Sequence, residues 1–327
     1  MAKRKKEKKK KKGSKKVKNL RFNILKACAG LFVLLFLVVG VGFLYNYYIS
    51  RHKPIPIPVK QTAPLKIKIQ KKKTVSKPPV FEVYPKEERQ YIKIKPKGKA
   101  IPDRHLPNVA IIIDDVGYHP DLENKFLQLD AIFTFSVLPF SPHKKSIIKA
   151  AQKKGREIML HLPMEPKEFP AISPGPGALL TTMNPDQLIN QLNKDIDDVP
   201  FIKGVNNHMG SKMTASDTQM YQIVSVLKQR GLYFIDSRTA PKTYGKESAK
   251  LFKISFAERD VFIDHKQDKE FIRKQIHELI NIANRHGEAV AIIHPYPITY
   301  EVISEMLPYM KKKINLVPAS AIVKDLS

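Results

Sequence analysis

From Asn108 to its end, the chain alternates short apolar runs with helical patterns, and this alternation restricts the fold more than any other feature. The runs have the length and the β-branched content of buried strands. They occupy residues 109–113, 132–138, 158–162, 202–206, 232–236, 252–256, 261–263, 289–293 and 314–317. Repeated β-α units of this size predict a parallel sheet or a β/α barrel.

Helix starts between these runs are marked by Asn or Asp caps and, at Asn184-Pro185, by a proline in the first helical position. Helices are expected at residues 184–197, 217–230, 268–284 and 299–310. The segment around Tyr244 and Lys246 is expected to be a solvated loop. The fold class is therefore α/β, with one domain over residues 108–327.

The N-terminal part has a different composition. Residues 1–26 are dominated by lysine and are too highly charged to bury a core. Residues 27–50 contain no charged side chain, and their length matches the ~20 apolar residues that a helix needs to cross a bilayer. No small-x-small cleavage site follows, which favours an uncleaved transmembrane anchor over a signal peptide. A buried helix of a soluble protein is the alternative.

Positive charge is retained on the cytoplasmic side of a membrane, so residues 1–26 are expected to form a cytoplasmic tail. The chain would then cross the inner membrane once and place residues 108–327 in the periplasm or outside the cell. Residues 51–107 hold ten of the 25 prolines, with lysines between them. This composition predicts a disordered, extended linker, and a short edge strand is the alternative.

The net charge of +28 suggests a nucleic-acid binder until its distribution is considered. Residues 1–107 carry 30 Lys+Arg and 5 Asp+Glu, a net charge of +25. Residues 108–327 carry the remaining 58 − 30 = 28 Lys+Arg and 30 − 5 = 25 Asp+Glu, a net charge of +3. No specific nucleic acid is therefore expected as a partner. The basic arm favours anionic lipid or an anionic polymer. The single cysteine, Cys28, excludes an internal disulfide and a thiolate metal cluster.

Polar side chains with acid–base or metal-binding chemistry follow many of the expected strands, where functional groups gather in parallel α/β folds. They are Asp114 and Asp115, His161 and Glu165, Asn207, His208 and Ser211, Asp236 and Arg238, Asp264, and His294. Each has an ordinary explanation by itself, such as a core histidine or a turn aspartate. Together they indicate a metal-assisted or acid–base site.

Asp114 and Asp115 pose a geometric problem, because successive residues of a regular strand point to opposite faces of the sheet. Either one carboxylate is structural, or the strand end is distorted and brings both to one site. Two histidines and a carboxylate make a suitable ligand set for a zinc-type divalent ion. Such an ion lowers the pKa of bound water to around 7 and polarises a carbonyl oxygen. A second carboxylate then acts as base, and a further histidine protonates the leaving group.

Residues 108–327 resemble the divergent polysaccharide deacetylase family, a branch of the NodB-homology carbohydrate esterases. The resemblance is carried by A-I-I-I-D-D-V-G-Y (110–118), L-P-F (138–140), G-R-E-I-M-L-H-L-P-M-E-P (155–166), G-V-N-N-H-M-G-S-K-M-T (204–214), F-I-D-S-R-T (234–239), R-D-V-F-I-D (259–264) and A-I-I-H-P-Y-P-I-T (291–299). It implies a distorted (β/α) barrel that removes N- or O-acetyl groups from a polysaccharide with a divalent metal.

The resemblance also implies roles for individual residues. Asp114 matches the family's general base, Asp115 its metal aspartate, His161 its first metal histidine and His294 its general acid. The wider deacetylases use His-x-x-x-His for the metal, whereas this chain has His161-x-x-x-Glu165.

Either Glu165 or His208 is expected to complete the metal site, and His208 is preferred because imidazole suits zinc. Asp236 and Arg238 are expected to assist catalysis by orienting the base and the acid. Asp264 and Asn207 are expected to support the metal and acid residues from behind.

Other chemistries fit less well. P-G-P-G-A at 174–178 lacks the Lys-Ser/Thr of a phosphate loop, and Ser173 and Ser211 lie in no G-x-S-x-G context. The expected function is a membrane-anchored, metal-dependent deacetylase acting on an acetylated envelope polysaccharide or peptidoglycan-type glycan. Two alternatives remain: a glycan-binding or envelope-assembly protein without efficient turnover, and a binder of nucleic acid or another anionic polymer through the lysine arm.

Overall fold

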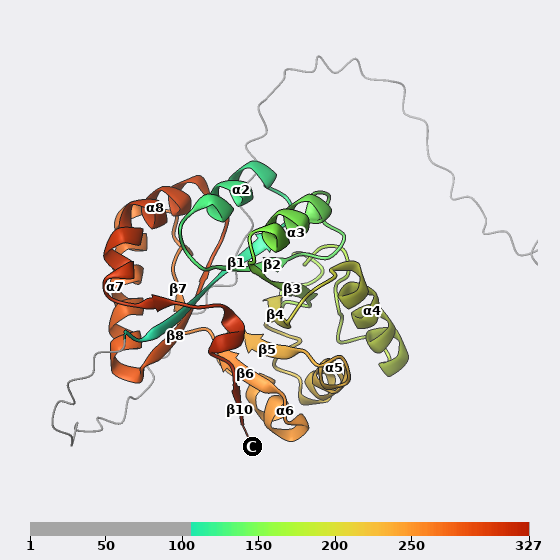
Figure 1. The fold of residues 1–327 in the computed structure, drawn as a ribbon. Helices are drawn as coiled ribbons and strands as arrows, with labels where there is room; N and C mark the ends of the chain where they lie inside the picture. Colours follow the sequence, from blue (N-terminus) through green and yellow to red (C-terminus); the bar gives the residue numbers. More distant parts are fainter. Residues whose placement is uncertain (1–105, 327) are drawn as a thin grey trace, which may run out of the picture. The chain divides into compact units, whose positions relative to one another are not determined.

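The computed structural model describes residues 106–326 (Figure 1). The predictions of a basic tail and an anchor lie outside the described residues, as does nearly all of the predicted linker. Among residues 106–326, no helix combines the length and the apolarity that a membrane span requires.

The described chain folds around one sheet of ten strands, in which every pair is parallel except β10 with β6. The strands are β1 (Asn108–Val116), β2 (Thr134–Val137), β3 (Glu157–Met164), β4 (Gly204–Met209), β5 (Tyr233–Asp236), β6 (Ser255–Glu258), β7 (Val261–Phe262), β8 (Glu288–Ile293), β9 (Asn315–Leu316) and β10 (Lys324–Asp325). Their order is β10-β6-β5-β4-β3-β2-β1-β8-β7, with β9 beside β1. Within the described residues β7 does not pair with β6 or β10, so the predicted barrel is an open half-barrel.

Helices surround the outer face of the sheet (Figure 1). They are α2 (Pro120–Gln128), α3 (Lys144–Lys153), α4 (Pro185–Asp198), α5 (Asp217–Gln229), α6 (Gly245–Phe252), α7 (Lys269–His286) and α8 (Pro297–Lys311). The four helices expected from start signals correspond to α4, α5, α7 and α8. Asn184 caps α4 through a capping box with Gln187, and the Asp268 carboxylate caps α7. The prediction of a loop around Tyr244 and Lys246 was wrong, because α6 begins at Gly245.

Alternate residues of the strands belong to two separate apolar cores. On β1, Ile111 and Ile113 pack toward the helices, whereas Ala110 and Ile112 face the inside of the half-barrel. The inner core is completed by the short 3-10 helix η1 (Ala319–Ala321) and the residues after it. On β1, the next inward position after Ile112 is the first that carries a charged side chain. That position is Asp114.

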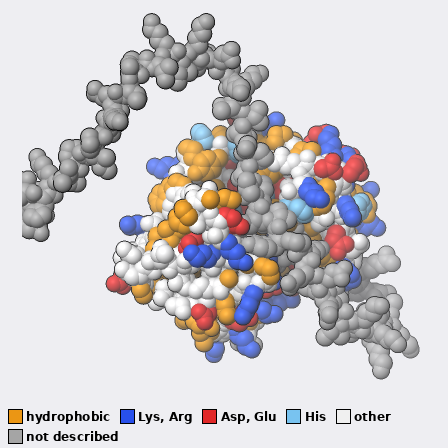
Figure 2. All heavy atoms as spheres, turned by 180° about the vertical axis from the view of Figure 1, so that it is seen from behind, with side chains coloured by type: hydrophobic (Ala, Val, Ile, Leu, Met, Phe, Trp, Pro, Cys, Tyr) orange, Lys and Arg blue, Asp and Glu red, His pale blue; other side chains and the backbone are white. Residues whose placement is uncertain are grey.

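Charged side chains are mixed on the surface of the described domain. Figure 2 shows Lys and Arg side chains interspersed with Asp and Glu side chains on the face seen from behind. Salt bridges on the surface join opposite charges from neighbouring elements, as between Lys311 and Asp130 and between Arg273 and Glu305. This mixture accords with the small net charge of residues 108–327.

Asp195 on α4 is a buried carboxyl group with an incomplete set of hydrogen bonds. Its Oδ1 accepts a hydrogen bond of 2.8 Å from Gln191, while its Oδ2 has no partner within the described part of the chain. Gly177 lies directly over it, since a Cβ added there would be 2.6 Å from Oδ1. Burial raises the pKa of Asp195 to about 8, with a further increase from Asp198. The group is therefore protonated in the folded protein at neutral pH.

This carboxyl group makes folding stability fall as the pH rises. Between about pH 4, where an unfolded aspartate ionises, and about pH 8, the folded state keeps a proton that the unfolded state has lost. The free energy of unfolding therefore decreases as the pH rises, with a slope of at most about 1.4 kcal/mol per pH unit. We expect Asp195→Asn to raise the melting temperature at pH 8 by several degrees and to flatten this slope. Thermal unfolding followed by circular dichroism at pH 5, 6.5 and 8 measures it. Asp186→Asn, which removes an exposed carboxylate from the same helix, is the control and is expected to keep the slope.

Candidate metal centre

The carboxyl end of β1 is distorted at Asp115. The pairing register between β1 and β2 shifts between Ile113 and Val116, and Asp115 has a φ of 56°, in the left-handed region. Asp114 continues the inward alternation of β1, and the left-handed turn redirects Asp115 toward the same side. The end of β1 is therefore distorted, and both carboxylates lie beside the same imidazole, that of His161.

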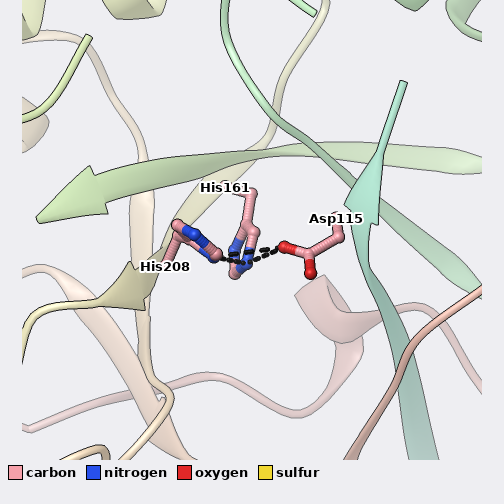
Figure 3. Close-up of side chains that lie close together, drawn as sticks. All are labelled: Asp115, His161 and His208. Atoms are coloured by element: carbon pink, nitrogen blue, oxygen red, sulfur yellow. Dashed lines mark hydrogen bonds and ion pairs between the residues drawn. The ribbon is translucent and has the colours of Figure 1, made fainter. Parts of the chain in front are cut away.

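Asp115, His161 and His208 converge from three strands, β1, β3 and β4 (Figure 3). The Asp115 Oδ1 lies 3.3 Å from His161 Nε2 and 3.1 Å from His208 Nδ1, and the two imidazole nitrogens are 3.1 Å apart. In a tetrahedral zinc site with bonds of about 2.1 Å, ligand atoms are separated by about 3.4 Å. The three atoms therefore form a triangle close to the size that one divalent ion requires.

Asp114 lies beside this triangle. Its Oδ2 is 3.6 Å from His161 Nε2, its side chain is nearly fully buried, and both carboxylate oxygens accept hydrogen bonds from the Asn206 amide, at 2.9 and 3.1 Å. Burial raises its pKa, although His161, His294 and the Asn206 hydrogen bond act in the opposite direction. Such a carboxylate is a better proton acceptor than an ordinary exposed aspartate.

Asp115 behaves differently from its neighbour. Burial by itself raises a carboxyl pKa, but the charge and the hydrogen bonds of His208 and His161 outweigh it and hold the pKa of Asp115 well below its usual range. Asp115 is therefore ionised at neutral pH, as a metal ligand must be. The two adjacent carboxylates are thus suited to different tasks.

His294 follows β8 and closes the other side of the site. Its Nε2 lies 4.0 Å from Asp115 Oδ2, while its Nδ1 lies 3.0 Å from Asp264 Oδ1. Asp264 is itself held by the His294 backbone N–H at 2.6 Å and by the Thr299 hydroxyl at 2.8 Å. Burial favours the neutral imidazole, but the Asp264 carboxylate outweighs it and raises the pKa of His294 to about 9.

Glu165, the alternative ligand, has its carboxylate bound elsewhere. Its Oε2 accepts hydrogen bonds from the Thr181 backbone at 2.5 Å and hydroxyl at 2.7 Å, and its Oε1 pairs with Lys212 at 2.6 Å. It is not part of the Asp115–His161–His208 group. The structure thus places His208, and not Glu165, beside the other two ligand atoms.

Asp236 and Arg238 lie apart from the triangle. Asp236 shares the outer side of β5 with Phe234, which packs against the helices, and a Cβ added to Gly245 of α6 would be 2.6 Å from its Oδ2. The Arg238 guanidinium donates to Thr243 Oγ1 and to the Pro241 carbonyl, each at 3.0 Å. Asp236 Oδ1 also accepts the Arg238 N–H at 2.8 Å, so both side chains stabilise the turn after β5, and neither is part of the Asp115–His161–His208 group.

Asn207, expected behind the metal residues, also holds this turn. Its Oδ1 accepts the Ser237 N–H at 2.8 Å, and its Nδ2 donates to the Met209 carbonyl at 2.8 Å. It therefore fixes the end of β4 against the turn after β5, on the side opposite to His208.

Two residues near the site were missed in the sequence. Asn206, fully buried on β4, contacts Asp114 and His161. Arg259 bonds the carbonyls of Ser237 and Arg238, and burial lowers its pKa to about 10. The alternation of β4 could have revealed Asn206, since it faces the same side as His208 two positions later. Arg259 precedes a two-residue strand, where no such periodicity exists.

The fold and the site together define a polysaccharide-deacetylase-like α/β half-barrel. The family model described as divergent polysaccharide deacetylase matches residues 111–323. The chain therefore belongs to the divergent polysaccharide deacetylase family, as its motifs indicated.

Known proteins resemble this chain over about two thirds of its length. The uncharacterized protein YibQ of Escherichia coli (strain K12) is 35% identical over 217 residues, covering 66% of this chain and 67% of that protein. An uncharacterized protein of Haemophilus influenzae is 32% identical over 209 residues, covering 64% and 74%. The crystal structure of an uncharacterized protein from Agrobacterium tumefaciens C58 superposes with a TM-score of 0.64 at 23% identity, covering 68% of this chain and 92% of that one. The last similarity concerns the fold alone.

Substitutions of the residues that form the triangle test which of the candidate residues bind the metal. Loss of a residue that supports a metal ligand weakens metal affinity about 10–100-fold. We expect Asp115→Ala or His208→Ala to weaken zinc affinity by at least this much, because each substitution removes one of the three candidate ligand atoms. Titration calorimetry with zinc, supported by metal analysis of the purified chain, measures this.

Glu165→Gln is the matched control. It should leave zinc affinity within about threefold of the parent, because Thr181 and Lys212 hold that side chain away from the triangle. A large loss in Glu165→Gln together with full affinity in His208→Ala would contradict the assignment.

Proposed function

We propose that this protein is a metal-dependent deacetylase that removes acetyl groups from an envelope polysaccharide, with zinc as its metal. The observation that carries the proposal is the triangle of Asp115, His161 and His208, with Asp114 on one side and His294 on the other. Two imidazoles and one carboxylate form a ligand set that suits zinc and leaves a coordination position open. Membership in the deacetylase family supports the same chemistry.

Asp114 is the proposed general base. When bound, the zinc ion would polarise the acetyl carbonyl and increase the acidity of the attacking water. Asp114 lies 3.6 Å from a proposed metal ligand and has its pKa raised by burial, so it can take a proton from a water held beside the ion. Asn206 donates to both Asp114 oxygens and keeps the carboxylate oriented toward His161.

His294 is the proposed general acid. Asp264 accepts the Nδ1–H of the ring, which leaves the protonated Nε2 directed toward Asp115. With a pKa of about 9, the ring is an imidazolium at neutral pH and can give its Nε2 proton to the departing amine or alcohol of the sugar. Base and acid therefore stand on the two sides of the metal ligands.

The location of this activity belongs to the same proposal. The uncharged residues 27–50 would anchor the chain in the inner membrane, with the lysine-rich residues 1–26 in the cytoplasm. The proline-rich residues 51–107, at about 3.1 Å per residue when extended, would let the domain reach on the order of 100 Å from the bilayer. An acetylated peptidoglycan-type glycan in the periplasm or outside the cell would be within that distance.

Substitution of the proposed base tests the reaction directly. We expect Asp114→Asn to lower acetate release from an N-acetylated glycan by about 10²–10⁴-fold while the chain still binds zinc, because the amide cannot accept the proton. Acetate is measured enzymatically, and the zinc content of each preparation is determined in parallel. Full acetate release by the zinc-loaded variant would reject this role for Asp114.

The pH profile tests the proposed acid. The acid works only while His294 is protonated, so activity should be lost as the pH rises through the pKa of the ring. Asp264→Asn removes the carboxylate that raises this pKa, and we expect the alkaline limb of kcat to move to lower pH. An alkaline limb that stays in place would show that His294 is not the titrating acid.

A glycan-binding or envelope-assembly role without efficient turnover is the second candidate. It is favoured by one observation: the chain has Glu165 where the wider deacetylases have a second metal histidine, and that glutamate is bound to Thr181 and Lys212. Retention of acetylated glycan by zinc-loaded protein, with no acetate released, would support this candidate over the enzyme.

A further inference from the structure

Asn206 occupies the inner side of β4, where a single carboxamide contacts both the proposed base and a proposed metal ligand. The side chain is fully buried. Its Nδ2 lies 2.9 and 3.1 Å from the two oxygens of Asp114, and its Oδ1 lies 2.9 Å from His161 Nδ1. His161 lies directly opposite it in the register of β3 and β4. Asn206 is therefore bonded to both groups at once.

The chemistry of its partners fixes which way the amide points. An ionised carboxylate only accepts hydrogen bonds, so the amide NH₂ must face Asp114. The amide oxygen then faces His161 and also accepts the Ser136 hydroxyl at 2.6 Å. The reverse orientation would set the amide oxygen against the Asp114 carboxylate and leave no acceptor for Ser136 Oγ on the other side.

This orientation decides the tautomer of His161. Because the amide oxygen is an acceptor, Nδ1 of the imidazole must carry the proton and donate it. Nε2 is then the nitrogen that faces the triangle, where it lies 3.3 Å from Asp115 Oδ1 and 3.1 Å from His208 Nδ1, and it is the nitrogen that would bind a cation. The opposite tautomer would place a hydrogen atom where the cation belongs.

The amide is also held from the β5 side. Its Nδ2 lies 3.3 Å from Ser237 Oγ. The backbone of Ser237 is fixed in turn by Asn207, which accepts its N–H, and by Arg259, which donates to its carbonyl at 2.7 Å. Asn206, Ser237, Asn207 and Arg259 thus form one connected network beneath the site.

We infer that Asn206 is a positioning residue that couples zinc binding to general-base catalysis, by fixing the tautomer of His161 with its oxygen and the orientation of Asp114 with its nitrogen. This inference rests on the proposed function for its catalytic half. Its metal half depends only on the ligand triangle and holds for a binding protein as well.

The two halves of the amide can be separated by substitution. Asn206→Asp keeps an acceptor for His161 but replaces the donor to Asp114 with a repelling carboxylate. Asn206→Ala removes both contacts. Asn193→Ala is the matched control, because the amide of this half-buried asparagine donates to the Ile189 carbonyl of its own helix. The full-length chain is used throughout, with zinc affinity measured by chelator competition and acetate release measured on an N-acetylated oligosaccharide.

We expect Asn206→Ala to weaken zinc affinity about 10–100-fold, because the tautomer of His161 is no longer fixed. Asn206→Asp should bind zinc within about threefold of the parent or more tightly, yet lose about 100-fold in kcat with little change in KM. Asn193→Ala should match the parent in both measurements. Melting temperatures of all variants accompany these values.

If Asn206 had a merely structural role, zinc affinity and kcat would fall together in both Asn206 variants, in proportion to the loss in melting temperature. That result, or unchanged zinc affinity in Asn206→Ala, overturns the inference. If the parent chain releases no acetate at all, the proposed function fails. The contrast in zinc affinity between the two variants then decides whether Asn206 positions His161.

Discussion

Adjacent residues of a strand point to opposite sides of a sheet, yet Asp114 and Asp115 serve one site because Asp115 adopts a left-handed conformation. A non-glycine residue pays about 1–2 kcal/mol for this conformation. The register shift beside it shows that the ladder between β1 and β2 is interrupted where the turn occurs. Two adjacent carboxylates with opposite pKa shifts, one held ionised and one suited to accept protons, follow from this one deviation.

The other polar residues of the site form hydrogen bonds with charged and polar groups that are buried away from water. Asn206 joins Asp114 to His161, and Asp264 joins His294 to α8 through Thr299. A buried polar group without a partner costs about 1–3 kcal/mol, so each of these bonds maintains the fold as well as the geometry of the site. The open sheet makes this pairing possible, because its inner side is only partly filled by apolar residues and leaves the carboxyl ends of β1, β3 and β4 for polar ones.

Much of this arrangement could be predicted, and the failures have physical causes. The strands and the helix caps at Asn184 and Asp268 follow from local patterns, and polar strand ends converge because parallel strands end at one edge. Asp236 was expected to orient the base and the acid, but its place in the alternation of β5 turns its side chain toward α6. Sequence spacing suggested Glu165 as a ligand; only the folded position of Lys212 shows where its charge is used. Helices α2, α3 and α6 begin after His119, His143 and Tyr244, and so lack the Asn or Asp cap that marked α4 and α7 in the sequence.

The C-terminal segment around η1 has a consequence for the order in which the domain is assembled. Ala319 and Ile322 pack in one apolar cluster with Ala110 and Ile112, and β9 pairs with β1, so the first strand of the domain is completed by residues about 200 positions later in the chain. A nascent chain that ends before them already contains every ligand atom of the triangle. It lacks the apolar residues that cover Ala110 and Ile112, so the inner side of β1 gains these contacts only when the C-terminal segment is present.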